Sequence, residues 1–408
     1  MRPVELGLRA NLAQFGLLVA VNAFVGAMIG LERSTLPLIG ETDFGVASRA
    51  GVLSFIVAFG LAKALTNLGA GALAARAGRR RLLISGWLVA LPVPLLVAVA
   101  PSWGWIVAAN LLLGVNQGLA WSMTVVMKID LVGPRRRGFA LGLNEAAGYG
   151  GVALTAAVSG WLAAEFAARD VLVVAGAAIA LAGLALSVLF VRDTAGHVAL
   201  EQSSHDDTAP PSRRRPALRV CSQAGLVNNL NDALAWGLVP LYMAAAGASV
   251  GEIGLIAGLY PAVWGVGQIW TGHWSDRVGP KPLIVAGMLT QAAALGVLSA
   301  SGGEVAVAAV AAVGLGAGTA LVYPTLIAAV SDSVTPVQRA PAIGVYRFWR
   351  DMGYVAGGVI AGVCADALGA EGAIALVAAV TAVSGLWVAR ELPGPARAAT
   401  VAAARGSS

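Results

Sequence analysis

The stretch "GHWSDRVGPKPLIVAG" at 272–287 repeats the earlier stretch "GALAARAGRRRLLISG" at 71–86 with an offset of 201 residues. A second pair, "GVNQGLA" at 114–120 and "GLGAGTA" at 314–320, recurs at an offset of 200. In the first pair, glycines and basic residues separate two apolar runs in each copy. Because the pattern occurs twice at about half the chain length, we predict two structurally equivalent halves.

The composition requires lipid as the solvent for most of the surface. Of 408 residues, 58% are hydrophobic and only 12% are charged, whereas a soluble domain is about a quarter charged. Twelve apolar segments are long enough to cross a hydrocarbon core of about 30 Å as helices: 12–39, 51–74, 82–100, 103–127, 138–163, 171–191, 220–245, 253–274, 283–301, 305–330, 341–364 and 372–389. We predict an all-α integral membrane protein with twelve transmembrane helices as two pseudo-symmetric six-helix bundles.

A polar segment separates the predicted bundles. Its sequence, "RDTAGHVALEQSSHDDTAPPSRRRPALR", is rich in Ser, Pro, Asp and Arg and cannot bury a core, so we predict a flexible linker. The predicted divisions are an N-terminal bundle over 1–191, the linker over 192–219, and a C-terminal bundle with a short cytoplasmic tail over 220–408.

The basic residues orient the predicted bundles in the membrane. Of the 27 lysines and arginines, 21 lie in the termini, the linker and the connections on the same side. Only Arg49 and Arg169 lie on the opposite side. Positive residues favour the cytoplasmic face, so we predict cytoplasmic termini, and we expect a bacterial inner (plasma) membrane. The first apolar run has no convincing cleavage site and is interpreted as a retained span.

Several classes of function are disfavoured. The net charge of +6 could suggest nucleic acid, but the basic residues form short clusters between apolar segments, so we expect no nucleic-acid partner. The two cysteines and three histidines show no ligand spacing, so we expect no metal and no cofactor. The chain has no Gly-x-x-x-x-Gly-Lys-Ser/Thr loop for ATP. We expect a monomer without enzymatic activity, and a receptor or scaffold is a remote alternative.

The repeated loops carry a family resemblance. The pattern Gly-x-x-x-Asp-Arg-x-Gly-x-Lys, formed by Gly272, Asp276, Arg277, Gly279 and Lys281, resembles the signature loop of the major facilitator superfamily. The earlier copy has Gly71, Arg76, Gly78, Arg79 and Arg80, with Ala75 at the acidic position. Together with twelve spans and a central linker, the resemblance covers essentially the whole chain. It implies a secondary transporter that works by alternating access.

The resemblance also implies a role for these loops in a cytoplasmic gate. In the superfamily, the loop aspartate helps to hold the cytoplasmic side closed. Here Ala75 supplies no charge, whereas the resemblance implies that Asp276 lies opposite the start of the fifth span and the arginines at 135–137. We therefore expect the gate to depend on one latch instead of two.

Eight ionisable residues lie inside predicted spans: Glu32, Arg33, Lys63, Glu145, Asp232, Arg347, Arg350 and Asp351. Each costs roughly 2.5–3.5 kcal/mol at a helix centre, so they should face the interior of the protein. The eleventh span carries one stripe at helical spacing, formed by Arg347, Arg350, Asp351 and Tyr354. Alignment of the repeats sets Glu145 opposite Arg347 or Arg350. These residues indicate a polar path between the halves.

Roles for these residues follow from their chemistry. Proton coupling needs a carboxyl group whose proton affinity changes with its surroundings, and the candidates are Asp232, Glu145 and Glu32. The four cations favour an anionic or zwitterionic solute, although the four carboxylates could also pair with them internally. The substrate-binding candidates are Arg33, Lys63, Asn67, Asn116, Gln117, Trp121, Asn228, Asn231, Trp236, Tyr323, Arg347, Arg350, Asp351 and Tyr354.

Other interpretations stay open at this point. Arg347 and Asp351 could form a structural ion pair at i, i+4, and Glu32 and Arg33 could simply reach the membrane interface. A transporter alternative is multidrug efflux of amphiphilic compounds by proton antiport, suggested by aromatic residues near the path: Trp121, Trp236, Tyr260, Trp264 and Trp349. The fifth span, however, lacks the Gly-Pro pair typical of drug antiporters.

Overall fold

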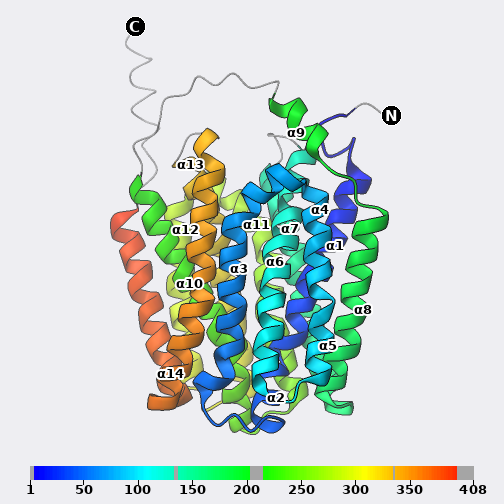
Figure 1. The fold of residues 1–408 in the computed structure, drawn as a ribbon. Helices are drawn as coiled ribbons and strands as arrows, with labels where there is room; N and C mark the ends of the chain where they lie inside the picture. The colour runs from blue at the N-terminus through cyan, green and yellow to red at the C-terminus, as the bar shows by residue number, and fades with distance from the viewer. Residues whose placement is uncertain (1–3, 133–136, 203–214, 334–335, 393–408) are drawn as a thin grey trace, which may run out of the picture.

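The computed structural model describes residues 4–132, 137–202, 215–333 and 336–392, and over these ranges the chain forms helices and no strand. The helices are α1 (Leu12–Arg33), α2 (Leu36–Thr42), α3 (Arg49–Ala77), α4 (Arg79–Ala90), α5 (Pro92–Val99), α6 (Trp103–Val132), α7 (Arg137–Glu165), α8 (Ala168–Leu189), α9 (Ala195–Gln202), α10 (Arg215–Ala245), α11 (Val250–Val278), α12 (Pro280–Ser299), α13 (Val305–Asp332) and α14 (Pro336–Glu391). Most stand upright side by side (Figure 1).

Local breaks explain how fourteen helices make twelve spans. Pro37 and Pro92 lie in the first turns of α2 and α5, where proline starts a new helix within one crossing. The 56 residues of α14 would extend about 84 Å as one straight helix, far more than a bilayer core. Gly369, with φ 78° and ψ 167°, divides α14 into two spans. With α1–α2 and α4–α5 as single crossings and α9 excluded, the described helices match the twelve predicted spans.

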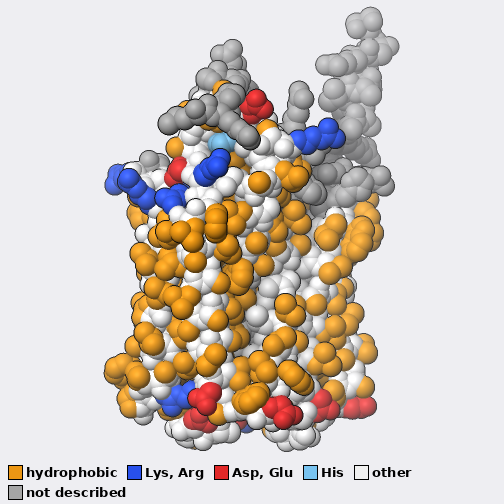
Figure 2. All heavy atoms as spheres, turned by 90° about the vertical axis from the view of Figure 1, so that its right-hand side faces the viewer, with side chains coloured by type: hydrophobic (Ala, Val, Ile, Leu, Met, Phe, Trp, Pro, Cys, Tyr) orange, Lys and Arg blue, Asp and Glu red, His pale blue; other side chains and the backbone are white. Residues whose placement is uncertain are grey.

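The surface of the bundle is adapted to lipid. Nine described helical segments are long and apolar enough to cross a membrane by length and hydropathy. Large apolar side chains such as Leu154, Val174 and Leu386 are exposed on these helices, as expected where lipid replaces water. Figure 2 shows an apolar belt around the middle, with charged side chains at the two ends. The first and last described residues lie at one end, here called the terminal end, and the other is called the distal end (Figure 1).

The two repeat loops adopt the same turn. Gly78 ends α3 with φ 87° and ψ 150°, and Gly279 ends α11 with φ 79° and ψ 163°. A positive φ is readily adopted only by glycine, which explains why both copies place glycine there. The sequence repeat is therefore also a structural repeat, with α1–α8 forming a first half and α10–α14 a second half.

Two segments of the predicted flexible linker are helical. Residues 195–202 form α9, and α10 already begins at Arg215, while the residues between them lie outside the described part. The start of α9 is stabilised because Asp193 accepts a hydrogen bond from the Ala195 amide at 2.9 Å. The Thr194 hydroxyl also donates to Asp130 at 2.6 Å. The prediction of flexibility over all of 192–219 is therefore wrong for these two segments.

The halves are in direct contact at the distal end. A Cβ atom added to Gly160, near the end of α7, would lie 2.5 Å from the Cα atom of Gly254, near the start of α11. A Cβ atom added to Gly362 of α14 would lie 2.6 Å from the Cα atom of Ala50 of α3. Small residues allow such close approach of helices in membranes. The distal side is therefore closed in this structure.

Candidate functional site

The charged residues predicted inside spans lie in the protein interior. Seven of the eight are buried, and Arg347 is half-buried. A buried charge requires an opposite charge or hydrogen bonds. The partners of each residue therefore distinguish residues that stabilise the fold from residues that remain free to bind a solute.

A small cavity between the two halves is lined by six of the fourteen substrate-binding candidates. It is lined by Lys63, Asn67, Trp121, Ser122, Tyr149, Tyr323, Arg347 and Arg350. These residues come from α3, α6 and α7 of the first half and from α13 and α14 of the second. In this conformation the cavity has room for about one water molecule, so the structure is occluded around its centre.

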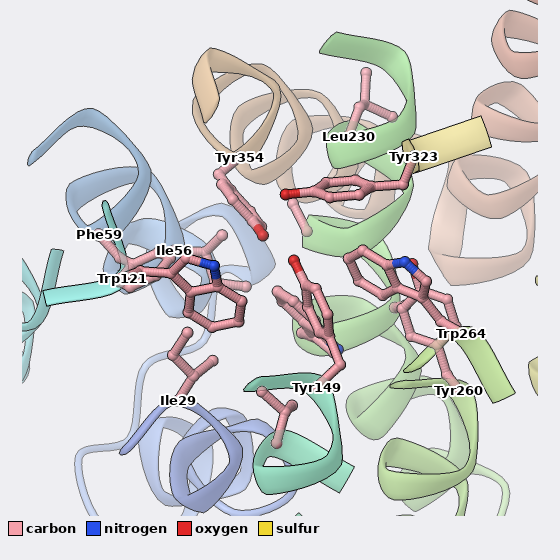
Figure 3. Close-up of a cluster of buried hydrophobic side chains, with 14 of the residues drawn as sticks. Ile29, Ile56, Phe59, Trp121, Tyr149, Leu230, Tyr260, Trp264, Tyr323 and Tyr354 are labelled. Atoms are coloured by element: carbon pink, nitrogen blue, oxygen red, sulfur yellow. The ribbon is translucent and has the colours of Figure 1, made fainter. Parts of the chain in front are cut away.

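Aromatic rings pack tightly around this cavity (Figure 3). The Tyr149 ring lies 3.6 Å from the Trp264 ring and 5.2 Å from the Trp121 ring, measured between centroids. Tyr323 packs edge-on against Tyr149 and Trp264. These contacts connect α6 and α7 with α11 and α13, so movement of one half against the other must rearrange them.

Arg350 and Asp351 form the central ion pair. Nε and Nη2 of Arg350 donate to Oδ1 of Asp351 at 2.9 and 2.5 Å, and Nη1 donates to the Tyr323 hydroxyl. Across the interface, the Asn67 side-chain amide donates to Oδ2 of Asp351 at 2.5 Å. The structure thus pairs Asp351 with its neighbour Arg350, and the alternative of an ion pair with Arg347 is not formed.

Two other cations at the cavity lack a carboxylate partner in the part of the chain that the structure describes. The Lys63 ammonium lies 5.2–5.7 Å from the ring centroids of Phe59, Trp121 and Tyr354. Nε of Arg347 is buried and has no described hydrogen-bond partner. Cation–π contacts offset only part of the cost of burying an ammonium group. The cavity therefore presents positive charge that an anion could neutralise.

The candidate proton-coupling carboxylates lie in three different surroundings. Asp232 accepts hydrogen bonds from the hydroxyl groups of Tyr260 and Tyr354, the latter at 3.4 Å. Glu145 accepts from the Trp121 indole at 3.0 Å, while its Oε2 atom has no described partner. Glu32 lines a separate small cavity of the first half, among α1, α5 and α8. Only Glu145 hydrogen-bonds a residue of the central cavity.

Four amide candidates point into the bundles and not toward the central cavity. In the first half, Asn116 and Gln117 donate to the backbone carbonyls of Gly86 and Val25, both at 2.9 Å. In the second half, Gln291 of α12 hydrogen-bonds both Asn231 and Asn228, and Thr381 of α14 also donates to Asn231. In this conformation these four side chains connect helices within each half.

The structure also identifies cavity residues that were not among the candidates. Tyr149 and Ser122 line the central cavity, and Ser122 donates to Asn67 at 2.7 Å. Tyr149 could have been found from the repeat, because the "GY" pair at 148–149 aligns with the "GY" pair at 353–354 that contains the candidate Tyr354. Ser122 carries no comparable signal, since single serines are common in membrane helices.

The predicted cytoplasmic gate is only partly described. The side chains of Gly71, Ala75, Gly272, Asp276 and Arg277 lie outside the described part, so their contacts are not known. Among the remaining gate residues, Arg79 pairs with Asp130 at 2.8 Å, and Arg80 donates to the backbone carbonyls at 188 and 191. Arg76 is exposed and Lys281 is half-buried.

A contact between the halves that the sequence did not indicate lies at the distal end. The carboxylate of Asp366, on α14, accepts hydrogen bonds from the first residues of α3: the Ser48 hydroxyl at 2.7 Å, the Arg49 amide at 2.6 Å and the Ala50 amide at 3.1 Å. A carboxylate at a helix N-terminus satisfies free amides and interacts favourably with the helix dipole. Asp366 therefore joins the two halves across the distal side.

A polar cavity enclosed between two repeated helical halves, each of six spans, defines a membrane transporter. The family model of the Major Facilitator Superfamily matches residues 12–230 and 221–407. The chain belongs to this superfamily, which confirms the predicted fold class and the resemblance of the repeated loops. It is accordingly an integral membrane protein.

Relatives and a solved structure support this assignment. An uncharacterized MFS-type transporter of Salmonella typhimurium, STM4428, is 26% identical over 342 residues, which cover 78% of this chain and 81% of the relative. The multi-drug resistance efflux pump PmrA homolog of Lactococcus lactis is 25% identical over 276 residues, covering 65% and 67%. The crystal structure of the human organic anion transporter MFSD10 (TETRAN) superposes with a TM-score of 0.70 at 16% identity, covering 92% of this chain and 98% of that one.

Proposed function

We propose that the protein is a proton-coupled secondary transporter that moves a small organic anion or zwitterion by alternating access. The observation that supports this proposal is the pair of cations, Lys63 and Arg347, that form no ion pair among the described residues, at a cavity to which both halves contribute. A carboxylate would neutralise this charge where it is shielded from water and would contact both halves at once. Binding there would favour the occluded state over open ones.

Asp232 is the proton-coupling residue in this proposal. It is fully buried in the second half, and its ligands are tyrosine hydroxyl groups that can donate to an ionised carboxylate or accept from a protonated one. Tyr354, one of these ligands, also contacts Lys63 through its ring. Gain or loss of a proton on Asp232 would thereby change the surroundings of a cation at the cavity.

Flux into proteoliposomes with an imposed pH gradient tests this function. A panel of radiolabelled mono- and dicarboxylates should include at least one compound that accumulates only when the gradient is present. Asp232→Asn keeps the shape of the side chain and removes the titrating group, so it should abolish this accumulation and still allow exchange. Accumulation by Asp232→Asn equal to that of the parent protein would refute its role, and failure of every carboxylate would refute the substrate class.

A second candidate function is efflux of amphiphilic drugs. Two observations favour it: the aromatic cluster around Tyr149 and Trp264, and the relative named as a multi-drug resistance efflux pump. In this case ethidium should leave loaded proteoliposomes when a pH gradient is imposed, and carboxylates should not compete. Trp349, one of the aromatic candidates, is 48% exposed and does not line the cavity.

We propose further that both termini and the linker face the cytoplasm, in a bacterial inner membrane, with the boundaries of the halves at 191 and 220. The excess of basic residues on that side supports the orientation. A reporter that fluoresces only in the cytoplasm should be active when fused to either terminus. Size determination in detergent should give a monomer.

A further inference from the structure

Arg33 is a buried cation whose hydrogen bonds are not satisfied. It is the last residue of α1 and is fully buried, and none of its three guanidinium nitrogens has a partner among the described residues. The neighbouring Glu32 acts on Arg33 electrostatically but forms no ion pair with it, and it lines the separate cavity among α1, α5 and α8. Asp232, the other carboxylate that acts on Arg33 electrostatically, is held by Tyr260 and Tyr354. A buried arginine in this condition is destabilising unless an anion reaches it.

The surroundings of Arg33 determine the shape of anion it can accept. The guanidinium carbon lies 4.7 Å from the Trp236 ring centroid, 5.0 Å from that of Phe59 and 6.0 Å from that of Phe55. A guanidinium packed among aromatic rings keeps its donors at the edge of its plane, where two parallel N–H groups fit one carboxylate. The arrangement thus favours a planar oxyanion over a cation or a neutral solute.

A row of three aromatic rings separates Arg33 from the central cavity. The Phe59 and Tyr354 centroids are 5.6 Å apart, and Tyr354 stacks on Trp236 at 5.8 Å. Lys63 contacts Phe59 and Tyr354 of this row. On α3 it lies one turn closer to the terminal end than Phe59. Arg33 contacts the same row and also Phe55, one turn nearer the distal end. The two cations therefore lie on opposite sides of the row along the axis of the bundle.

We propose that Arg33 is a second anion-binding position on the solute path, on the distal side of this row, and that it binds the carboxylate of an organic anion in its plane. The inference rests on the proposed function, since it adds a second station to the same path. When the distal side opens, Arg33 is the cation that an anion entering from that side meets before Lys63 and Arg347. Closure of the distal side by Asp366 and the paired glycines then buries Arg33.

Benzoate binding to the purified full-length protein tests this proposal. Trp236 lies against Arg33, so benzoate at this position should change the tryptophan fluorescence, and Trp236→Phe should remove most of that change. Arg33→Lys retains the charge but not the two parallel donors, and we expect it to weaken benzoate binding at least tenfold. In an Asp366→Ala background, which removes the distal contact, the parent Arg33 should bind benzoate several-fold more tightly.

Matched variants separate this proposal from the proposed function. Arg169→Lys is the control, because Arg169 also lies near the distal end but donates to the backbone carbonyls of Val97 and Ala100, and it should leave benzoate binding unchanged. If Arg347→Lys weakens binding and Arg33→Lys does not, only the central cavity binds anions and the second position is refuted. If Arg33→Lys alone weakens binding and no carboxylate is transported, Arg33 binds anions but the proposed function is wrong. Absence of benzoate binding to the parent protein refutes the second position, whereas the proposed function is decided by the flux panel.

Discussion

Arg347 and Arg350 lie one turn apart on the same helix but have different surroundings. Arg350 is buried and bound to Asp351 and Tyr323, whereas Arg347 lines the cavity without a described carboxylate partner. The first arrangement is typical of a residue that stabilises the fold, and the second of a residue that is free for a ligand. Substitution of each by lysine should therefore have separable effects.

Arg347→Lys should weaken binding of the transported anion with little effect on stability. Loss of a two-donor contact to a charged group costs about 1.5–3 kcal/mol, which corresponds to a tenfold or greater loss of affinity. Titration of the purified variant with the transported carboxylate measures this. Parent-like affinity would show that Arg347 makes no two-donor contact.

Arg350→Lys should reduce stability. A lysine cannot contact Asp351 and Tyr323 together as the guanidinium does, so we expect a loss of about 1–3 kcal/mol of unfolding free energy. Thermal unfolding in detergent measures the loss, with Arg76→Lys as the control because Arg76 is exposed. An unchanged unfolding temperature would mean that the ion pair contributes no net stability.

At the scale of elements, α14 holds the start of α3 through one carboxylate. Asp366→Asn keeps a side-chain oxygen that can accept hydrogen bonds but removes the negative charge at the helix N-terminus. That charge contributes about 0.3–1 kcal/mol, so the fraction open at the distal side should rise by up to about fivefold. Reactivity of a single cysteine placed on the distal side of the path, in a background without Cys221 and Cys364, measures the change.

The control for Asp366→Asn is a cap that does not join the halves. Glu252 forms a capping box with Ser249 at the start of α11, entirely within the second half. Glu252→Gln weakens a helix start of the same kind and should leave distal reactivity unchanged. If Glu252→Gln raised distal cysteine reactivity as much as Asp366→Asn, the cause would be a weakened helix start, and the contact between the halves would not be responsible.

The glycine contact between α7 and α11 gives a second prediction at this scale. Gly160→Ala introduces a methyl group 2.5 Å from the Gly254 Cα atom, and such overpacking costs about 1–3 kcal/mol. The variant should favour the state open at the distal end. Gly150→Ala, on the same helix with nothing within 4 Å, is the matched control. Distal cysteine reactivity should rise only for Gly160→Ala.

For the whole molecule, alternating access requires that the interactions closing the cytoplasmic side and those closing the distal side contribute similar free energies. If the Asp276 loop is the cytoplasmic latch expected from the sequence, Asp276→Asn should shift the population toward the cytoplasm-open state, opposite in sign to Asp366→Asn. A change of about 1.4 kcal/mol would move the ratio of states tenfold. Ala75→Asp should shift it back toward closure.

The double variant Asp276→Asn, Asp366→Asn tests this balance. Asp276 lies near the end of α11 and Asp366 on α14, at opposite ends of the predicted path, so their effects should add. The cysteine reactivity on the two sides should then return toward that of the parent. A double variant that behaves like Asp366→Asn alone would show that the Asp276 loop is not the latch.

The sequence by itself determined the architecture. Lipid must be the solvent for a chain with so few charges, and in lipid the backbone can satisfy its hydrogen bonds in only a few ways, so twelve apolar runs predict twelve helices. The repeat at 71–86 and 272–287 predicted equivalent halves, because the same sequence pattern forms the same local structure. Both copies have glycine at the turn, at Gly78 and Gly279, where φ is positive. Burial of the ionisable residues also followed, because exposure of charge to lipid is costly.

Only the tertiary structure decided which polar residues face one another. Helical spacing allowed Asp351 to pair with Arg347, yet its partner is Arg350, and Asn67, 284 residues away in sequence, completes the site. Asn228 and Asn231 shared a stripe with Asp232 but bind Gln291 within the bundle. Polar residues at helical spacing predict only which face of the helix their side chains share. The partner on that face depends on how the two halves dock, which depends on side-chain packing between segments distant in sequence.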